Sequence, residues 1–126
     1  MMYLWVFRIT GVFALALGVL LLVAPHVYLS LYVPLYDPIN MPFAAQRLSP
    51  AIIGLGALLL LASSLPQGAF AARFAMLAAL VWFGVAGTGV FHYLTGTATW
   101  NILVAAGTEV ILGVLFLTAA RSHRTP

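Results

Sequence analysis

The sequence predicts an all-α membrane protein, an up-and-down bundle of four transmembrane helices. Its 126 residues are 64% hydrophobic and only 6% charged, whereas a soluble domain carries about a quarter charged residues. The mean hydropathy is +1.14. Four apolar segments approach or exceed the roughly 20 residues that an α-helix needs to cross a bilayer. So few charges cannot cover a water-facing surface, and we therefore expect an integral membrane protein.

The four apolar segments account for most of the chain, which we interpret as a single transmembrane domain. Pro25 ends the first segment, and a turn containing Pro66 and Gly68 separates the second from the third. Because this turn is short, we expect the second and third helices to be antiparallel neighbours. The first segment is too long for a signal peptide and has no basic residue before it, so we expect a helix of the mature protein. The predicted spans cover residues 3–24, 45–64, 69–93 and 99–120, with an outer interfacial loop at residues 25–44.

The arginines predict the orientation of the bundle. With four spans, Arg8, Arg73, Arg121 and Arg124 fall on the side of the chain termini, and only Arg47 falls on the opposite side. The positive-inside rule then places both termini in the cytoplasm, with the chain in the cell (inner) membrane. The same five arginines are too scattered to form a nucleic-acid-binding face. The chain has no cysteine, which excludes disulfides and thiolate chemistry.

The outer loop contains four prolines, so no long regular helix is expected to cross it. Between Pro25 and Pro34 a short interfacial helix is predicted. Tyr28, Tyr32 and Tyr36 recur every four residues, which is typical of aromatic side chains anchored at the depth of the lipid headgroups. A site for a lipid or quinone headgroup is the alternative interpretation of these tyrosines. Asp37 precedes a proline, a pattern that favours a turn.

Three charged residues are predicted to face the interior of the bundle, because each shares a helix face with small residues that allow close packing. Arg8 shares a face with Gly11, Arg47 with Gly54, and Glu109 with Gly113, because residues three, four or seven positions apart lie on one side of a helix. Arg73 is expected to extend to the headgroups beside the termini.

Glu109 is the only glutamate of the chain and lies near the middle of the fourth span. A carboxylate at this depth costs ~2.5–3.5 kcal/mol on insertion scales, so it needs a partner, a proton or a functional role. We expect it to pair with Arg47, directly or through water or a hydroxyl group such as that of Thr88 or Tyr93. Arg8 is an alternative partner. Two interpretations remain open: a structural residue that joins helices, and a proton carrier or cation ligand in a polar cavity.

His26 and His92 are predicted at the outer ends of the first and third spans. Two imidazoles at equal depth on different helices can ligate a haem or a metal. Their spacing forms no motif, however, and interfacial histidines commonly hydrogen-bond to lipid or water. We therefore predict no metal site and no cofactor. His26 and His92 are the weak candidates for metal ligands, and haem or quinone is the alternative to the absence of a cofactor.

Several short features of the sequence are similar to those of a known protein family. They are Arg8 with Gly11 in the first span, Arg47-Leu48-Ser49 at the start of the second span and Ile53-Gly54-Leu55-Gly56-Ala57 within it, and Glu109 with Gly113 and the final Ala119-Ala120-Arg121 of the fourth span. With these features the chain resembles the DoxX-like small four-span bacterial membrane proteins and related families of unknown function. The resemblance implies a four-helix membrane bundle. It also implies a partnership with membrane oxidoreductase complexes, as a subunit of quinone-linked enzymes.

The leading functional hypothesis is a small non-catalytic accessory or interaction subunit of a membrane complex. Short loops leave little surface outside the bilayer, so the expected partners are lipids and other transmembrane helices, including a homo-oligomer. The alternative is a small transporter, or a lipid- or quinone-binding bundle, that uses Glu109 and Arg47 in a polar cavity. No nucleophile–base pair, paired carboxylates or zinc-ligand spacing favours an enzyme. A cavity that reaches Glu109 would favour the transporter, and a dry, tightly packed Glu109 would favour the subunit.

Overall fold

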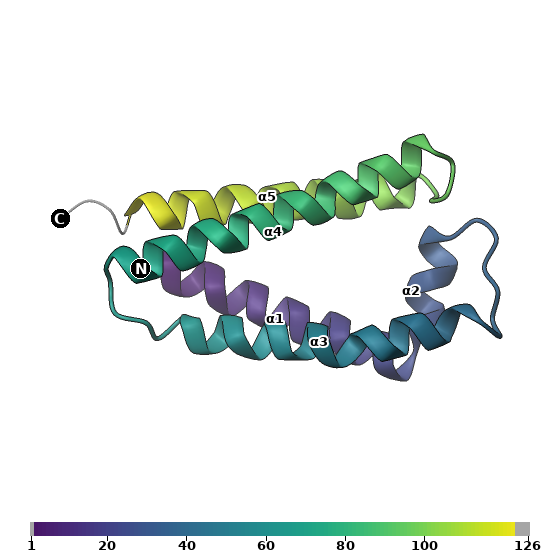
Figure 1. Cartoon of the computed structure of the whole chain (residues 1–126), viewed down its shortest axis with the longest axis horizontal. Helices are drawn as coiled ribbons and strands as arrows, with labels where there is room; N and C mark the ends of the chain where they lie inside the picture. The colour runs from purple at the N-terminus through teal and green to yellow at the C-terminus, as the bar shows by residue number, and fades with distance from the viewer. Residues whose placement is uncertain (1, 123–126) are drawn as a thin grey trace.

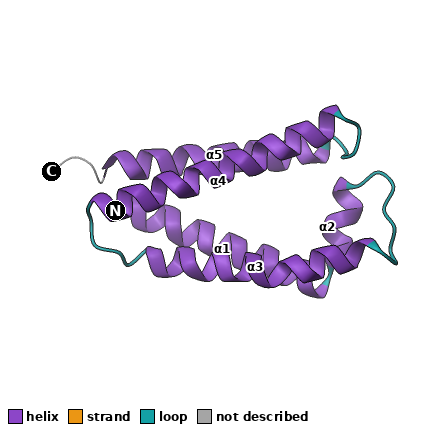
Figure 2. Cartoon of the chain, viewed as in Figure 1, coloured by secondary structure: helices purple, strands orange, loops and turns teal. Residues whose placement is uncertain are grey.

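The computed structural model describes residues 2–122, and within that range every regular element is an α-helix, which confirms the predicted all-α class (Figure 2). Four of the helices are long and apolar enough to cross a membrane. The fifth is a short helix between the first and second spans. The helices are α1 (Met2–Val23), α2 (Pro25–Tyr32), α3 (Met41–Ala62), α4 (Ala69–Leu94) and α5 (Asn101–Ser122).

The four long helices alternate in direction, as an up-and-down bundle requires (Figure 1). The start of α1, the loop 63–68 and the end of α5 lie at one end of the molecule, which we call the terminal end. The short helix α2 and the loops 33–40 and 95–100 lie at the other, the α2 end. Arg8, Arg73 and Arg121 lie in the terminal half of their helices and Arg47 lies near the α2 end; Arg124 is outside the described residues.

Helix α3 begins at Met41, four residues earlier than the predicted span, and runs through two prolines. Pro42 lies in the first turn, where its missing N–H has no intrahelical partner to lose. Pro50 lies inside the helix and removes the N–H that would bond the carbonyl of Gln46. The Ser49 hydroxyl donates to that carbonyl at 2.7 Å. A neighbouring side chain thus replaces the lost backbone donor, as proline in a membrane helix requires.

The bundle consists of two closely packed helix pairs, α1 with α3 and α4 with α5. Glycines allow the first pair to touch backbone to backbone. A Cβ atom on Gly56 would lie 2.7 Å from the Leu15 nitrogen and 2.8 Å from the Gly11 oxygen. In the second pair, the Phe83 ring packs against Gly113. Helices α3 and α4, expected to be antiparallel neighbours, border a common groove, but neither is the closest partner of the other. Each packs most closely against another helix, where glycine permits closer contact.

An aromatic cluster joins the two pairs at the terminal end. Phe7 of α1 is fully buried. Its ring stacks on Tyr3, with centroids 4.3 Å apart, and meets the edge of Phe116 of α5 at 4.8 Å. The ring of Phe74 in α4 is also near, with its centroid 5.7 Å from that of Phe7. One side chain therefore connects three of the four long helices, and it belongs to the main cluster of buried hydrophobic residues.

Toward the α2 end the two pairs diverge, and α2 crosses the space between them (Figure 1). Hydrogen bonds hold its last turn to the start of α5. The Thr99 hydroxyl donates to the Leu31 carbonyl at 2.7 Å, the Asn101 amide donates to the same carbonyl at 3.2 Å, and the Thr99 N–H donates to the Tyr32 carbonyl at 2.8 Å. These bonds satisfy carbonyls that a helix C-terminus otherwise leaves without partners.

We predict that Gly56→Ala destabilises the α1–α3 pair by about 1–3 kcal/mol, because the added methyl group meets backbone atoms that cannot rotate away. Gly54→Ala is the matched control, since a Cβ atom there meets nothing within 4 Å and both changes alter helix propensity equally. The measurement is the free energy of unfolding in mixed micelles. Equal stability of the two variants would contradict the close α1–α3 contact.

We also predict that Thr99→Val loosens α2. Loss of one hydrogen bond costs ~0.5–1.5 kcal/mol, so amide hydrogen exchange over residues 29–33 should become about two- to tenfold faster. Thr95→Val is the control, because the Thr95 hydroxyl donates to carbonyls of its own helix α4. Exchange in α2 that is the same in both variants would show that Thr99 does not hold this helix.

Candidate functional site

A cleft of about 390 Å³ lies at the α2 end, between α2, α4, the loop 95–100 and α5. It combines an apolar wall with hydroxyl, imidazole and carboxylate groups. The apolar members come from α4, α5, the loop and Val33 just after α2, and each of the four elements supplies at least one polar side chain. The lining residues are Tyr28, Tyr32 and Val33 beside α2, Val85, Thr88, Gly89 and His92 on α4, Thr97 and Ala98 in the loop, and Ile102 and Glu109 on α5.

Two residues of α5 line the cleft, Ile102 and Glu109, and Glu109 lies farther from the α2 end. It follows Asn101 by eight residues, about 12 Å along the helix axis. Its side chain is partly buried and makes no hydrogen bond or ion pair with any residue in 2–122. On the same helix, Gly113 and Phe116 are buried, so Glu109 lies on the inward face of α5. Its carboxylate therefore lines a cleft without a protein partner.

The expected interior positions of Arg8 and Arg47 are wrong. Both side chains are exposed, neither lines the cleft, and no ion pair connects either one with Glu109. The reason lies in the packing faces. Helix α3 buries Ser49, Gly56 and Leu59, whereas a Cβ atom on Gly54, the small residue used to orient Arg47, would meet nothing within 4 Å.

Tyr28 and Tyr32 form the α2 wall of the cleft. Their ring centroids are 4.6 Å apart, and both side chains are partly buried. Burial raises the pKa of Tyr28 to about 12, with smaller contributions in the same direction from Tyr32 and from the negative charge of Glu109. The carboxylate of α5 thus acts electrostatically on the phenol of α2, across the cleft that both residues line.

His92 lies nearer the α2 end of the cleft than Glu109. Its Nδ1 atom and the Thr97 hydroxyl share a hydrogen bond of 2.7 Å, and that hydroxyl also lies 3.1 Å from the His92 carbonyl oxygen. These bonds hold the loop 95–100 against the end of α4. His26 is exposed and does not line the cleft. Of the two histidines predicted at equal depth, only His92 therefore lines the cleft.

Thr88 lines the cleft, but its hydroxyl donates to the Val85 carbonyl of its own helix at 2.7 Å. It does not bridge Glu109 to Arg47. Tyr93 is exposed and lies outside the cleft lining. Tyr36 also lies outside the lining, and its buried hydroxyl has no hydrogen-bond partner in the described part of the chain.

Asp37 closes a turn in the loop that leads into α3. Its carboxylate accepts hydrogen bonds from the Asn40 side chain at 2.6 Å and from the Ile39 N–H at 2.8 Å. These donors favour the charged form and lower the pKa of Asp37. The residue has the turn-forming role that its position before Pro38 indicates, and it does not belong to the cleft.

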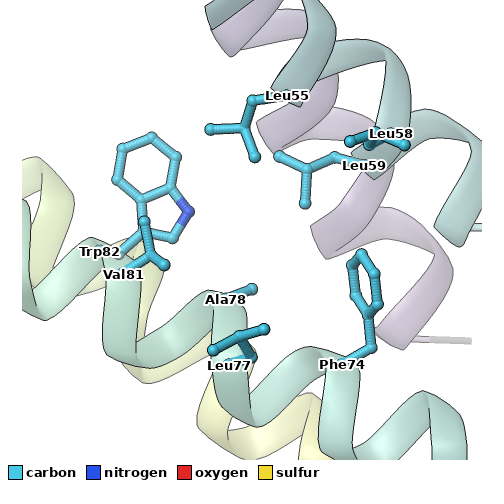
Figure 3. Close-up of a pocket in the computed structure, with 8 residues that line it drawn as sticks. All are labelled: Leu55, Leu58, Leu59, Phe74, Leu77, Ala78, Val81 and Trp82. Carbon is cyan, nitrogen blue, oxygen red and sulfur yellow. The ribbon is translucent and has the colours of Figure 1, made fainter. Parts of the chain in front are cut away.

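A second hollow, an apolar groove of about 110 Å³, runs between α3 and α4. Leu55, Leu58 and Leu59 of α3 face residues of α4 across it (Figure 3). Val81 and Trp82 of α4 line the groove, and Val85 of the same helix lines the cleft. Because these positions lie three or four residues apart, one continuous face of α4 borders both hollows.

The sequence interpretation missed the contributions of Gly89, Thr97 and Ile102 to the cleft. A usable signal was present on α4, where Val85, Thr88, Gly89 and His92 recur at helical spacing. The tyrosines of α2 were recognised as a candidate ligand site, but nothing in their spacing showed that they face Glu109. Only the position of α2 across the gap between the helix pairs brings these residues together.

The fold and its apolar spans define the class: a multi-pass membrane protein built as a four-helix bundle with a short helix across one end. Comparison with protein-family models, with characterised proteins and with solved structures finds no match.

We predict that Glu109→Gln lowers the pKa of Tyr28 from about 12, because the charge that opposes tyrosinate formation is gone. The pKa should stay above the ordinary value of 10.0, since burial is the larger cause. Alkaline titration of tyrosinate absorbance gives the measurement, with Tyr28→Phe subtracted to isolate this phenol.

The raised pKa also sets the pH dependence of stability. The folded state keeps the Tyr28 proton where the unfolded chain loses it, so this contribution is complete below pH 10 and declines as the pH rises to about 12. Tyr28→Phe should remove that decline. An identical Tyr28 titration in wild type and Glu109→Gln would show that the carboxylate does not act on the phenol.

Proposed function

We propose that this chain is a membrane protein that binds a small amphipathic molecule in the cleft between α2, α4 and α5, as a small transporter or carrier. The observation that carries the proposal is the unpartnered Glu109 carboxylate on the wall of a cleft. A residue that served only to join helices would be expected to pack against a partner group. An ionisable side chain at this depth is a functional candidate by default.

The size and lining of the cleft support the same proposal. Ligand sites in proteins are typically roughly 300–1,000 Å³, mostly apolar, with a few polar groups that fix the orientation of the ligand. The volume of about 390 Å³ falls in this range, and Val33, Val85 and Ile102 supply the apolar wall. Lipid or quinone headgroups remain within the ligand classes that such a lining admits. Arg47 has no part in the proposed site.

The proposed orientation has both termini in the cytoplasm of a bacterial cell, with the α2 end facing outward. It is supported by the arginines, since Arg8, Arg73 and Arg121 lie toward the terminal end and Arg47 toward the other. In this orientation the tyrosines and His92 border the cleft on the outer side of the membrane.

The second candidate is an accessory or interaction subunit of a membrane complex, and one observation favours it.

 Arg8 is exposed on α1 beside Trp5, Ile9 and Val12, which are also exposed. This apolar stripe with one cation would suit a partner helix that carries an acidic residue. The oxidoreductase partnership that the resemblance implies, and a homo-oligomer, belong to this second candidate.

The test of the leading proposal compares ligand-induced stabilisation of the wild type with that of a variant whose cleft is filled. The probes are the tetraphenylphosphonium cation, the tetraphenylborate anion and a neutral short-chain quinone, added to the chain in nanodiscs. At ~100 times its Kd, a ligand of the folded state stabilises by about 2.7 kcal/mol. We expect at least one probe to raise the Tm of the wild type and to lose this effect in Thr88→Phe.

Thr108→Phe is the matched control. Like Thr88, Thr108 is exposed and donates its hydroxyl to a carbonyl of its own helix, but it does not line the cleft. Its response to the probes should equal that of the wild type. If no probe stabilises the wild type more than Thr88→Phe, the cleft is not a ligand site and the accessory subunit becomes the better hypothesis.

A further inference from the structure

We propose that the ligand of the cleft is a lipophilic organic cation, which Glu109 binds in exchange for a proton. This inference rests on the proposed function and adds the charge and chemical class of the ligand. The lining of the cleft contains one carboxylate and no arginine, and the exposed arginines of the described helices form no ion pair with Glu109.

The groups that face Glu109 do not supply a permanent counter-charge. From α2 the titratable groups are the phenols of Tyr28 and Tyr32, and from α4 the only one is His92. The loop 95–100 contributes Thr97 and Ala98, which do not titrate, and no lining residue comes from α1 or α3. A carboxylate this deep in the membrane therefore takes its counter-charge from a bound proton or from a cation that enters the cleft.

His92 is too far toward the α2 end to serve as that counter-charge. The packing of α4 on α5 shows the register: Gly89 lies against Ile102 and Ala106, and Gly113 lies against Phe83. Glu109 is therefore level with residues near position 86 of α4, and His92 lies roughly two turns farther along the helix. Its Nδ1 atom is also engaged with the Thr97 hydroxyl.

The lining favours an organic cation over a metal ion. Hard cations such as Ca²⁺ need about six to eight oxygen ligands, and the described residues contain no group of three His, Cys, Asp or Glu side chains arranged to hold a metal. Tyr28 and Tyr32 instead present aromatic rings, with centroids 4.6 Å apart. Aromatic faces attract organic cations, most strongly where water is excluded.

The groove between α3 and α4 explains why the cation would be lipophilic. All its lining residues are apolar or aromatic (Figure 3), and the same face of α4 continues from Val81 and Trp82 to Val85 in the cleft. A ligand whose charged centre pairs with Glu109 can place its apolar part along this face. A small hydrated cation would gain nothing from such a surface.

The exchange balances in charge and in protons. The protonated carboxyl group of Glu109 and the free cation give the carboxylate–cation pair and one released proton. No covalent bond of the ligand changes. Because the cation competes with one proton, its apparent affinity should rise about tenfold per pH unit wherever Glu109 is protonated in the free protein, and should level off above that range.

The experiment is calorimetric titration of tetraphenylphosphonium into the full chain in nanodiscs over a series of pH values, with tetraphenylborate as the probe of similar shape and opposite charge. We expect saturable binding of the phosphonium and at least tenfold weaker binding of the borate. Titrations in two buffers with different heats of protonation should show one proton released per cation bound at the lower pH values.

Glu109→Gln keeps the shape of the side chain and removes its charge. It should weaken phosphonium binding at least tenfold and abolish the pH dependence, and Glu109→Asp should retain that dependence with lower affinity. Thr108→Phe should behave as the wild type. A melting curve of each variant checks that the fold is retained.

The outcomes separate this inference from the proposed function. If the borate or the quinone binds in a Thr88-dependent manner and the phosphonium does not, the cleft is a ligand site but the cation inference is wrong. Phosphonium binding that is unchanged by Glu109→Gln, or that releases no proton at any pH, also overturns it. If none of the probes binds, the inference and the proposed function both fail.

Discussion

The structure depends on the fact that its two helix pairs meet closely at one end only. Phe7 stacks on Tyr3 and contacts Phe74 and Phe116, which ties α1 to α4 and α5 at the terminal end. Within each pair, glycine permits tighter contact than any side chain between the pairs allows. Because contact between helices in lipid relies on close packing rather than on the hydrophobic effect, the pairs stay together internally and diverge from each other.

Because the pairs diverge, α2 can lie between them at the α2 end. At the α2 end the last carbonyl groups of a helix need partners outside that helix, and the diverging pairs leave a space between them. The short helix crosses it and bonds to Thr99 and Asn101 through its last carbonyls. In doing so it places Tyr28 and Tyr32 opposite Glu109, so the element that covers the gap also builds the polar wall of the cleft. Stability and candidate function thus share the same few hydrogen bonds.

Particular residues show why sequence reasoning succeeded for some positions and failed for others. Glu109 shares its helix face with Gly113 and Phe116, and both are buried. The small and the bulky neighbour therefore both indicate that Glu109 faces inward. Arg8 and Arg47 were oriented by Gly11 and Gly54, but a glycine marks an interior face only if another helix approaches it. Nothing approaches Gly54, and Gly11 lies at one margin of a face centred on Phe7, Thr10 and Ala14.

The sequence alone determined the class, the number of spans and their approximate limits, because hydropathy and helix length follow from local composition and the bilayer sets the scale. It also identified Glu109 as the residue that requires an explanation. Only the tertiary structure decided which helices pair, since that depends on which glycines meet across an interface. It likewise decided that the carboxylate has no arginine partner, because the surroundings of Glu109 are set by the path of α2 across the bundle rather than by any residue near it in the sequence.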